Sequence, residues 1–223
     1  MFPGEAAVTR RRRTQAERTA ATRERLLEAT VATLVERGWH RASTAAICRR
    51  ARVTRGAQLH HWPTKAGLVA AAIEHVFRRR HEELRQALLG AGAGGPAAIQ
   101  AAFRKLWEIY SGPTLVAWLE LVVAARTDRR LRAAIQGVDA RFMAEAEATL
   151  CGLFGARRGR RTAAAARLVT SLLDGLALHR QVQGEAAAAG PVLALFQELL
   201  APWGRGGLSP RTGTAARKKG HRR

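Results

Sequence analysis

The chain has 223 residues and a mass of 24.2 kDa, which is enough to bury a core without the support of disulfides. Its two cysteines are too few for a disulfide framework. Hydrophobic residues make up 47% and aromatic residues 5% of it, and its abundant alanine favours helix. The 38 Lys and Arg residues outnumber the 17 Asp and Glu residues, and the net charge of +21 indicates a polyanionic partner, either nucleic acid or an anionic membrane.

The most apolar stretch is too short to cross a membrane. Residues 115–125 are interrupted by Glu120, whereas a spanning helix needs about 20 apolar residues. The arginines at 10–13 precede polar residues and not an apolar segment, so no secretory leader is expected. We therefore predict a cytoplasmic protein with no membrane partner, in which Cys48 and Cys151 are inert thiols.

The positive charge is concentrated in two terminal arms and one internal segment. Residues 1–13 carry a net +3, residues 14–65 carry +6 and residues 205–223 carry +7. The C-terminal arm is almost free of apolar residues, so we expect it to be disordered. Such arms add non-specific affinity for phosphates, and a solvated tail without a role is the alternative.

The first predicted helix begins with a capping box. Thr14 and Glu17 have the required spacing, in which each side chain accepts a hydrogen bond from the other residue's backbone. Gly38 is predicted to end the helix near residue 37, because glycine commonly follows the last helical turn. The apolar face of this helix is formed by Leu27, Val31 and Leu34.

Two short helices are predicted next, followed by a long one. The first runs from Ser43 or Thr44 to about residue 51, and the second is capped by Thr54 and reaches about residue 61. Pro63 ends the second, and Thr64 caps a long helix that reaches about residue 89. Helix-period patterns then predict further helices at about 96–110, 113–125, 128–154, 162–184 and 191–203. The fold class is therefore all-α, with about nine helices.

Residues 43–62 have the layout of a helix-turn-helix, which places its second helix in the major groove of DNA. Gln58 and Trp62 share one face of that helix, and Trp62 is predicted to turn this face towards the core. The opposite face then carries small residues, which allow close approach to bases, and two histidines. These outward positions are Gly56, Ala57, His60 and His61.

Three features are expected to contact DNA most directly. Arg55 begins the second helix, where a guanidinium can read guanine edges. Lys65 and the helix N-terminus capped by Thr64 form a phosphate site. A solvated charge is the alternative for either residue, and a metal site at the histidine pair is not expected, because adjacent helical residues point apart. The complete predicted set is Ser43, Thr44, Thr54, Arg55, Gly56, Ala57, Leu59, His60, His61 and Lys65.

The stretch from Arg23 to Phe77 closely resembles the TetR/AcrR family of bacterial transcriptional regulators. The resemblance is carried above all by the run Thr-Arg-Gly-Ala-Gln-Leu-His-His-Trp-Pro-Thr-Lys at 54–65. Two positions depart from the family pattern. Gln58 replaces an aliphatic residue that faces the core, and Leu59 replaces a tyrosine that meets DNA, which leaves an apolar contact with a thymine methyl there.

The resemblance implies a helix-turn-helix domain followed by a helical domain for effector binding and dimerisation. We place the DNA-binding domain at 14–80, with its motif at 43–62, and the effector domain at 81–204, between a basic arm at 1–13 and a basic tail at 205–223. An unidentified small-molecule effector is expected to bind in a cavity of this domain. For the candidate lining residues, the alternative role is core packing or, for the ionisable ones, pairing with one another. The candidate lining residues are Phe103, Trp107, Tyr110, Trp118, Phe142, Asp174 and His179, with Glu120 as a further ionisable group.

The last two predicted helices are too apolar for a monomer. Apolar residues cover more than half the circumference of each, so we predict that helices 162–184 and 191–203 form a four-helix bundle between two subunits. The sequence therefore predicts a homodimeric, ligand-responsive regulator, most simply a repressor on a palindromic operator in double-stranded DNA. An architectural DNA-binding protein and an enzyme built on the C-terminal helices are the alternatives; no catalytic residues, cofactor or metal are expected.

Overall fold

The structure is a computed structural model that describes residues 14–90, 96–184 and 189–200. All regular secondary structure within these ranges is helical, and the all-α prediction with about nine helices is confirmed. The arms at 1–13 and 205–223 lie outside the described residues. In chain order, the helices are α1 (Gln15–Arg41), α2 (Thr44–Ala51), α3 (Arg55–His61), α4 (Lys65–Gly90), α5 (Pro96–Tyr110), α6 (Pro113–Ala124), α7 (Arg129–Phe154), α8 (Arg160–Gln183) and α9 (Ala189–Leu200).

Helix α1 begins at the predicted capping box and extends one turn beyond its predicted end. Thr14 Oγ1 accepts from the Glu17 backbone N at 3.2 Å, and the Thr14 backbone N donates to Glu17 Oε2 at 2.7 Å. Gly38 interrupts the helix with φ +68° and ψ 178°, but a last turn continues to Arg41. This backbone conformation is essentially restricted to glycine, so Gly38 redirects the helix and does not end it.

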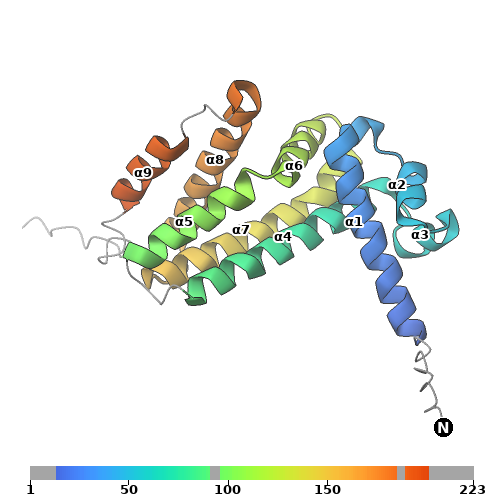
Figure 1. Ribbon diagram of the computed structural model, residues 1–223, viewed down its shortest axis with the longest axis horizontal. Helices are drawn as coiled ribbons and strands as arrows, with labels where there is room; N and C mark the ends of the chain where they lie inside the picture. Colours follow the sequence, from blue (N-terminus) through green and yellow to red (C-terminus); the bar gives the residue numbers. More distant parts are fainter. Residues whose placement is uncertain (1–13, 91–95, 185–188, 201–223) are drawn as a thin grey trace, which may run out of the picture.

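Helices α2 and α3 form the predicted helix-turn-helix and lie on the far side of α1 from α5, α8 and α9 (Figure 1). Helix α2 ends at Arg52, a non-glycine residue in the left-handed region (φ 53°, ψ 48°). Its backbone N–H donates to the carbonyls of Arg49 and Cys48, which satisfies the end of the helix. Thr54 then caps α3, and Thr64 Oγ1 accepts from the backbone N of Gly67 in the first turn of α4.

Two apolar clusters hold the described chain together, and α1 and α4 contribute to both. The smaller one joins α1, α2 and α4 through residues that include Leu26, Ile47 and Leu68. The larger one extends through the C-terminal helices and includes Ile73 of α4 and Leu173 of α8. Helix α4 is continuous across the predicted domain boundary at residue 80, which therefore stays a prediction.

The C-terminal helices pack as a bundle in which α4 and α8 both contact α7, and α9 packs on α5. The rings of Phe103 and Phe196 meet edge to face with centroids 5.9 Å apart. None of the described helices is long and apolar enough to cross a membrane. Several large apolar side chains of α8 and α9 remain exposed: Leu168, Leu178, Val182, Val192, Leu195 and Leu199.

Candidate functional site

Helix α3 presents its polar face to solvent because its caps and one buried side chain fix its orientation. Thr54 Oγ1 accepts from the Ala57 backbone N at 3.2 Å, which anchors the first turn. Gln58 is fully buried on the inner face, whereas Leu59 is 42% exposed. A Cβ added to Gly56 would meet no atom within 4 Å, so a partner has open access to the backbone there.

Arg55 is held against α2 by a hydrogen bond between two of the predicted DNA-contacting residues. Its Nη1 donates to Thr44 Oγ1 at 3.2 Å, and both side chains lie at helix N-termini. Ser43 Oγ accepts from the Ala46 backbone N at 3.1 Å and so caps α2. The structure thus gathers Ser43, Thr44, Thr54 and Arg55 around the beginnings of two adjacent helices, where backbone N–H groups favour anionic partners.

The two histidines differ in their surroundings. His60 is exposed, whereas His61 is half-buried beside the ring of Trp62, at a centroid distance of 5.7 Å. Partial burial lowers the pKa of His61, and the nearby His60 and Arg23 lower it further. His61 is therefore neutral at neutral pH, and any contact that it makes with a phosphate is a hydrogen bond without a full charge.

Gln58 is a polar residue in the core, and only one of its two polar side-chain atoms has a hydrogen-bond partner among the described residues. Its Nε2 donates to the Trp62 backbone O at 2.5 Å, and this bond closes the end of α3. Its Oε1 is buried and has no hydrogen-bond donor within the part of the chain that the structure describes. The departure from an aliphatic residue therefore adds one hydrogen bond and one unsatisfied acceptor to the core.

Lys65, the predicted phosphate anchor, is directed towards α1. Its Nζ donates to the Trp39 backbone O at 2.5 Å and lies 3.8 Å from the centroid of the Trp39 ring. Burial lowers the pKa of Lys65, and the carboxylate of Asp128 opposes this lowering. The side chain thus joins the start of α4 to α1, whereas the predicted phosphate anchor would leave its ammonium available to DNA.

Glu120 makes a contact between α6 and α1 that the sequence did not predict. Its Oε1 accepts from the Trp39 backbone N at 2.8 Å. A Cβ on Gly38 would lie 2.2 Å from the same oxygen, so any larger residue there would displace the carboxylate from its present position. The signal in the sequence is Gly38 itself, although a glycine at this position predicts only the end of a helix. Trp39 is therefore bonded on one side by α6 and on the other by Lys65 of α4.

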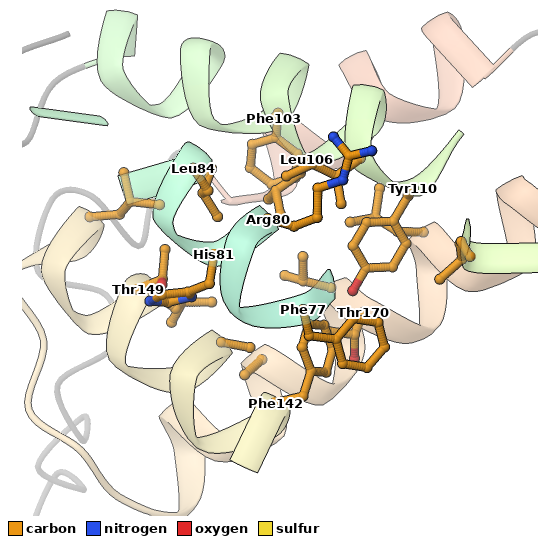
Figure 2. Close-up of a pocket in the computed structure, with 18 of the residues that line it drawn as sticks. Phe77, Arg80, His81, Leu84, Phe103, Leu106, Tyr110, Phe142, Thr149 and Thr170 are labelled. Carbon is orange, nitrogen blue, oxygen red and sulfur yellow. The ribbon is translucent and has the colours of Figure 1, made fainter. Parts of the chain in front are cut away.

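An apolar cavity of about 90 Å³ lies between α4, α5, α6, α7 and α8, and Leu200 at the end of α9 also lines it (Figure 2). Of the predicted lining residues, Phe103, Tyr110 and Phe142 line it. The sequence did not single out the contribution of α4, although its apolar positions repeat at helical spacing. The residues of α4 that line the cavity are Val76, Phe77, Arg80, His81 and Leu84.

The other four predicted effector residues are not in the cavity wall. Trp118 is buried behind it, with its ring 5.2 Å from that of Phe77, and Trp107 packs half-buried on the core. His179 is exposed on α8. Burial raises the pKa of Asp174 to about 6, and the neighbouring Asp139 raises it further while Arg167 opposes the rise.

The described chain has a helix-turn-helix at one end and an apolar cavity between helices at the other, which is the architecture of a DNA-binding transcriptional regulator. Residues 26–72 match the family of bacterial regulatory proteins, tetR family, and residues 111–202 match the C-terminal part of BetI-type transcriptional repressors. The chain belongs to the tetR family, as its sequence motif indicated.

Known relatives agree with this assignment. An uncharacterised HTH-type transcriptional regulator of Mycobacterium tuberculosis is 36% identical over 172 residues, which cover 76% of this chain and 88% of the relative. A crystal structure of a transcriptional regulator from Pseudomonas aeruginosa PAO1 matches at 28% identity with a TM-score of 0.63, covering 91% of this chain and 96% of its own. A TetR-family structure from Rhodococcus sp., at 18% identity, TM-score 0.67 and coverage of 82% and 100%, shows the shared fold alone.

Proposed function

We propose that the chain is a cytoplasmic, ligand-responsive repressor that binds a palindromic operator as a homodimer and releases it when an effector enters the cavity. The observation that carries this proposal is that α4 and α6 each contribute to the cavity and also bond to Trp39. On α6, Thr114 and Leu115 line the cavity and Glu120 bonds the Trp39 N–H. On α4, Phe77 lines the cavity, and Lys65 bonds the Trp39 carbonyl.

This arrangement links effector binding to the position of the DNA-binding helices. An effector that separates α4 from α6 changes the two bonds at Trp39, and α1 then shifts relative to the C-terminal bundle. Helix α2 packs on α1, so α3 moves with them. Half-sites in a palindromic operator lie about 34 Å apart, and a shift of a few Å defeats simultaneous docking of two recognition helices. The effector acts only by its differential affinity for the two arrangements.

Homodimerisation is proposed through the exposed apolar side chains of α8 and α9. On α9, Leu193 and Phe196 face inward while Leu195 and Leu199 are 58% and 63% exposed, so the helix is apolar on both faces. A second copy would cover the outer face by forming a four-helix bundle. Residues 201–203 of the predicted last helix lie outside the described residues.

The DNA-binding part of the proposal is tested by sequencing fragments that the purified chain selects from a random DNA pool. A palindromic consensus is expected, and Arg55→Ala should cost about 1–3 kcal/mol on that site and relax specificity at one position. Arg104→Ala on the exposed face of α5 is the matched control and should leave the consensus intact. Equal affinity for the selected site and random DNA would favour an architectural protein instead.

The coupling part is tested by calorimetry of an effector with and without operator DNA. Because coupling is reciprocal, DNA should weaken effector binding by the factor by which the effector weakens DNA binding. Glu120→Gln, which weakens the bond to Trp39, should reduce this factor, whereas Glu108→Gln on α5 should not. Identical effector affinity in both titrations would exclude the switch, and turnover of the effector would favour the enzyme alternative.

A further inference from the structure

The cavity wall combines a large apolar surface with a one-sided charge distribution. Its ionisable lining residues are Arg80 and His81 of α4, together with the phenol of Tyr110, and no carboxylate occurs among the described residues of the wall. Thr114, Thr149 and Thr170 supply hydroxyl groups, and all other lining residues are apolar. The carboxylates that act on wall residues, Glu83 and Glu145 at the two basic side chains and Asp174 at Tyr110, are not themselves part of the wall. An organic cation placed there would therefore lose its hydration without a direct counterion in the wall.

Arg80 is only partly neutralised by its own helix. Its Nη1 lies 3.0 Å from Glu83 Oε2, but the same carboxylate also faces Arg79, whose Nε is 3.8 Å from Glu83 Oε1. One carboxylate thus serves two guanidinium groups, and a surplus positive charge remains at this edge. Figure 2 shows the Arg80 side chain extended from α4 towards α5, past Leu106.

His81 lies on another side of the cavity. Its Nδ1 is 3.8 Å from Glu145 Oε2, and the carboxylate of Glu82, which is held by Arg85 and Gln86, is also close enough to interact with its charge. The carboxylates beside both basic residues of the wall are therefore already paired within the protein.

The apolar part of the cavity suits an aromatic group. Phe77 and Phe142 stand with ring centroids 4.7 Å apart and their planes inclined by 37°. Figure 2 shows the Tyr110 hydroxyl directed towards this pair. Burial raises the pKa of Tyr110 well above its usual range, so its hydroxyl remains protonated and can donate a hydrogen bond.

We propose that the cavity accepts an apolar aromatic molecule with a single carboxylate, which binds Arg80 while the ring packs against Phe77 and Phe142. The proposal rests on the proposed function, because it names the class of effector for that regulator. Aromatic side chains alone would also suit a quaternary ammonium ion. Arg80 decides against that class, because its guanidinium in the cavity wall repels a positive charge.

The test uses three probes of one shape on the full chain: phenylbutyrate, phenylbutyramide and phenylbutylammonium. Calorimetry should rank the carboxylate tightest, the amide next and the ammonium weakest. Arg80→Met keeps apolar contacts while removing the charge, and should lower affinity for phenylbutyrate about tenfold, as expected for a lost charged hydrogen bond. Affinity for the amide should stay unchanged, which also shows that the cavity remains folded. Arg80→Lys should restore part of the preference, and Arg78→Ala, an exposed arginine of the same helix, should leave it intact.

Two kinds of result would overturn the proposal. One is binding of the ammonium or the amide as tight as that of the carboxylate; the other is failure of all three probes to bind at millimolar concentration. The same protein preparations are assayed for selection of DNA without any probe. If the protein prefers the carboxylate probe but binds DNA without sequence selectivity, only the proposed function is refuted. If it selects a DNA sequence but does not prefer the carboxylate probe, only the effector class is refuted.

Discussion

The proposed DNA-binding face and the proposed effector cavity are built in opposite ways. The face on α2 and α3 comes from one short stretch of sequence, in which Ser43 and Thr54 cap helices that carry the predicted contact residues. The cavity is lined by residues that lie far apart in the sequence, such as Phe77 on α4 and Thr170 on α8. The first depends on local hydrogen bonds, and the second on how long helices pack.

The two regions meet at a junction that consists of Gly38, Trp39, Lys65 and Glu120. Trp39 is buried there, with its backbone N–H bonded to α6 and its carbonyl bonded to α4. A substitution at the junction should therefore affect both regions, whereas a substitution within either region that leaves the junction bonds intact should stay local. Substitutions in each place test this separation.

The largest effect is expected from Gly38→Ala. Alanine at φ +68° and ψ 178° is strained by about 1–3 kcal/mol, and its Cβ would collide with the Glu120 carboxylate. We expect the free energy of unfolding to fall by about 3 kcal/mol in urea, with loss of operator affinity. Gly152→Ala, whose Cβ would meet nothing within 4 Å on α7, is the control. Unchanged stability would mean that the junction does not hold the two regions together.

The same contrast explains what the sequence could predict. The capping box at Thr14, the helix starts at Ser43 and Thr54 and the burial of Gln58 follow from spacing within one turn of helix. The contact of Glu120 with Trp39 joins residues 81 positions apart, and periodicity carries no information on such a pair. Periodicity shows which side of a helix is apolar. It does not show whether a residue such as Trp118 borders a cavity or fills the core behind it.

Asp174→Asn should have the next largest effect, confined to the C-terminal bundle. Burial raises the pKa of Asp174 to about 6 from an ordinary 3.8, so the folded chain binds more protons than the unfolded chain between these values. The free energy of unfolding therefore falls as pH rises through this window. Since the carboxyl is partly solvated, we expect asparagine to stabilise the chain by about 1–2 kcal/mol at pH 7.

This gain should disappear near pH 4, where the unfolded carboxyl also begins to be protonated. Urea unfolding at several pH values measures it, with the exposed Glu108→Gln as the control. A gain that does not depend on pH would show that the ionisation of Asp174 is not its cause. Operator affinity should remain unchanged.

Gln58→Leu tests the core of the DNA-binding region. Leucine removes the buried, unsatisfied Oε1 but also loses the bond from Nε2 to the Trp62 carbonyl. An unsatisfied buried acceptor costs more than a typical hydrogen bond contributes, so a net stabilisation of about 1 kcal/mol is expected. The exposed Gln136→Leu on α7 is the control. A loss of stability in urea would show that the bond to Trp62 outweighs the orphaned oxygen.

Lys65→Met has the smallest expected effect and separates a structural role from a DNA contact. Methionine retains apolar packing against the Trp39 ring but loses the hydrogen bond to its carbonyl, so the free energy of unfolding should fall by about 0.5–1 kcal/mol. If the Lys65 ammonium stays on Trp39 in the complex with DNA, the slope of log affinity against log salt should not change. If Lys65 instead moves to a phosphate in the complex, the substitution by methionine should make that slope shallower by about 0.9. Measuring operator affinity across a salt series, with Lys105→Met on α5 as the control, therefore shows whether the first residue of α4 belongs to the junction or to the DNA-binding face.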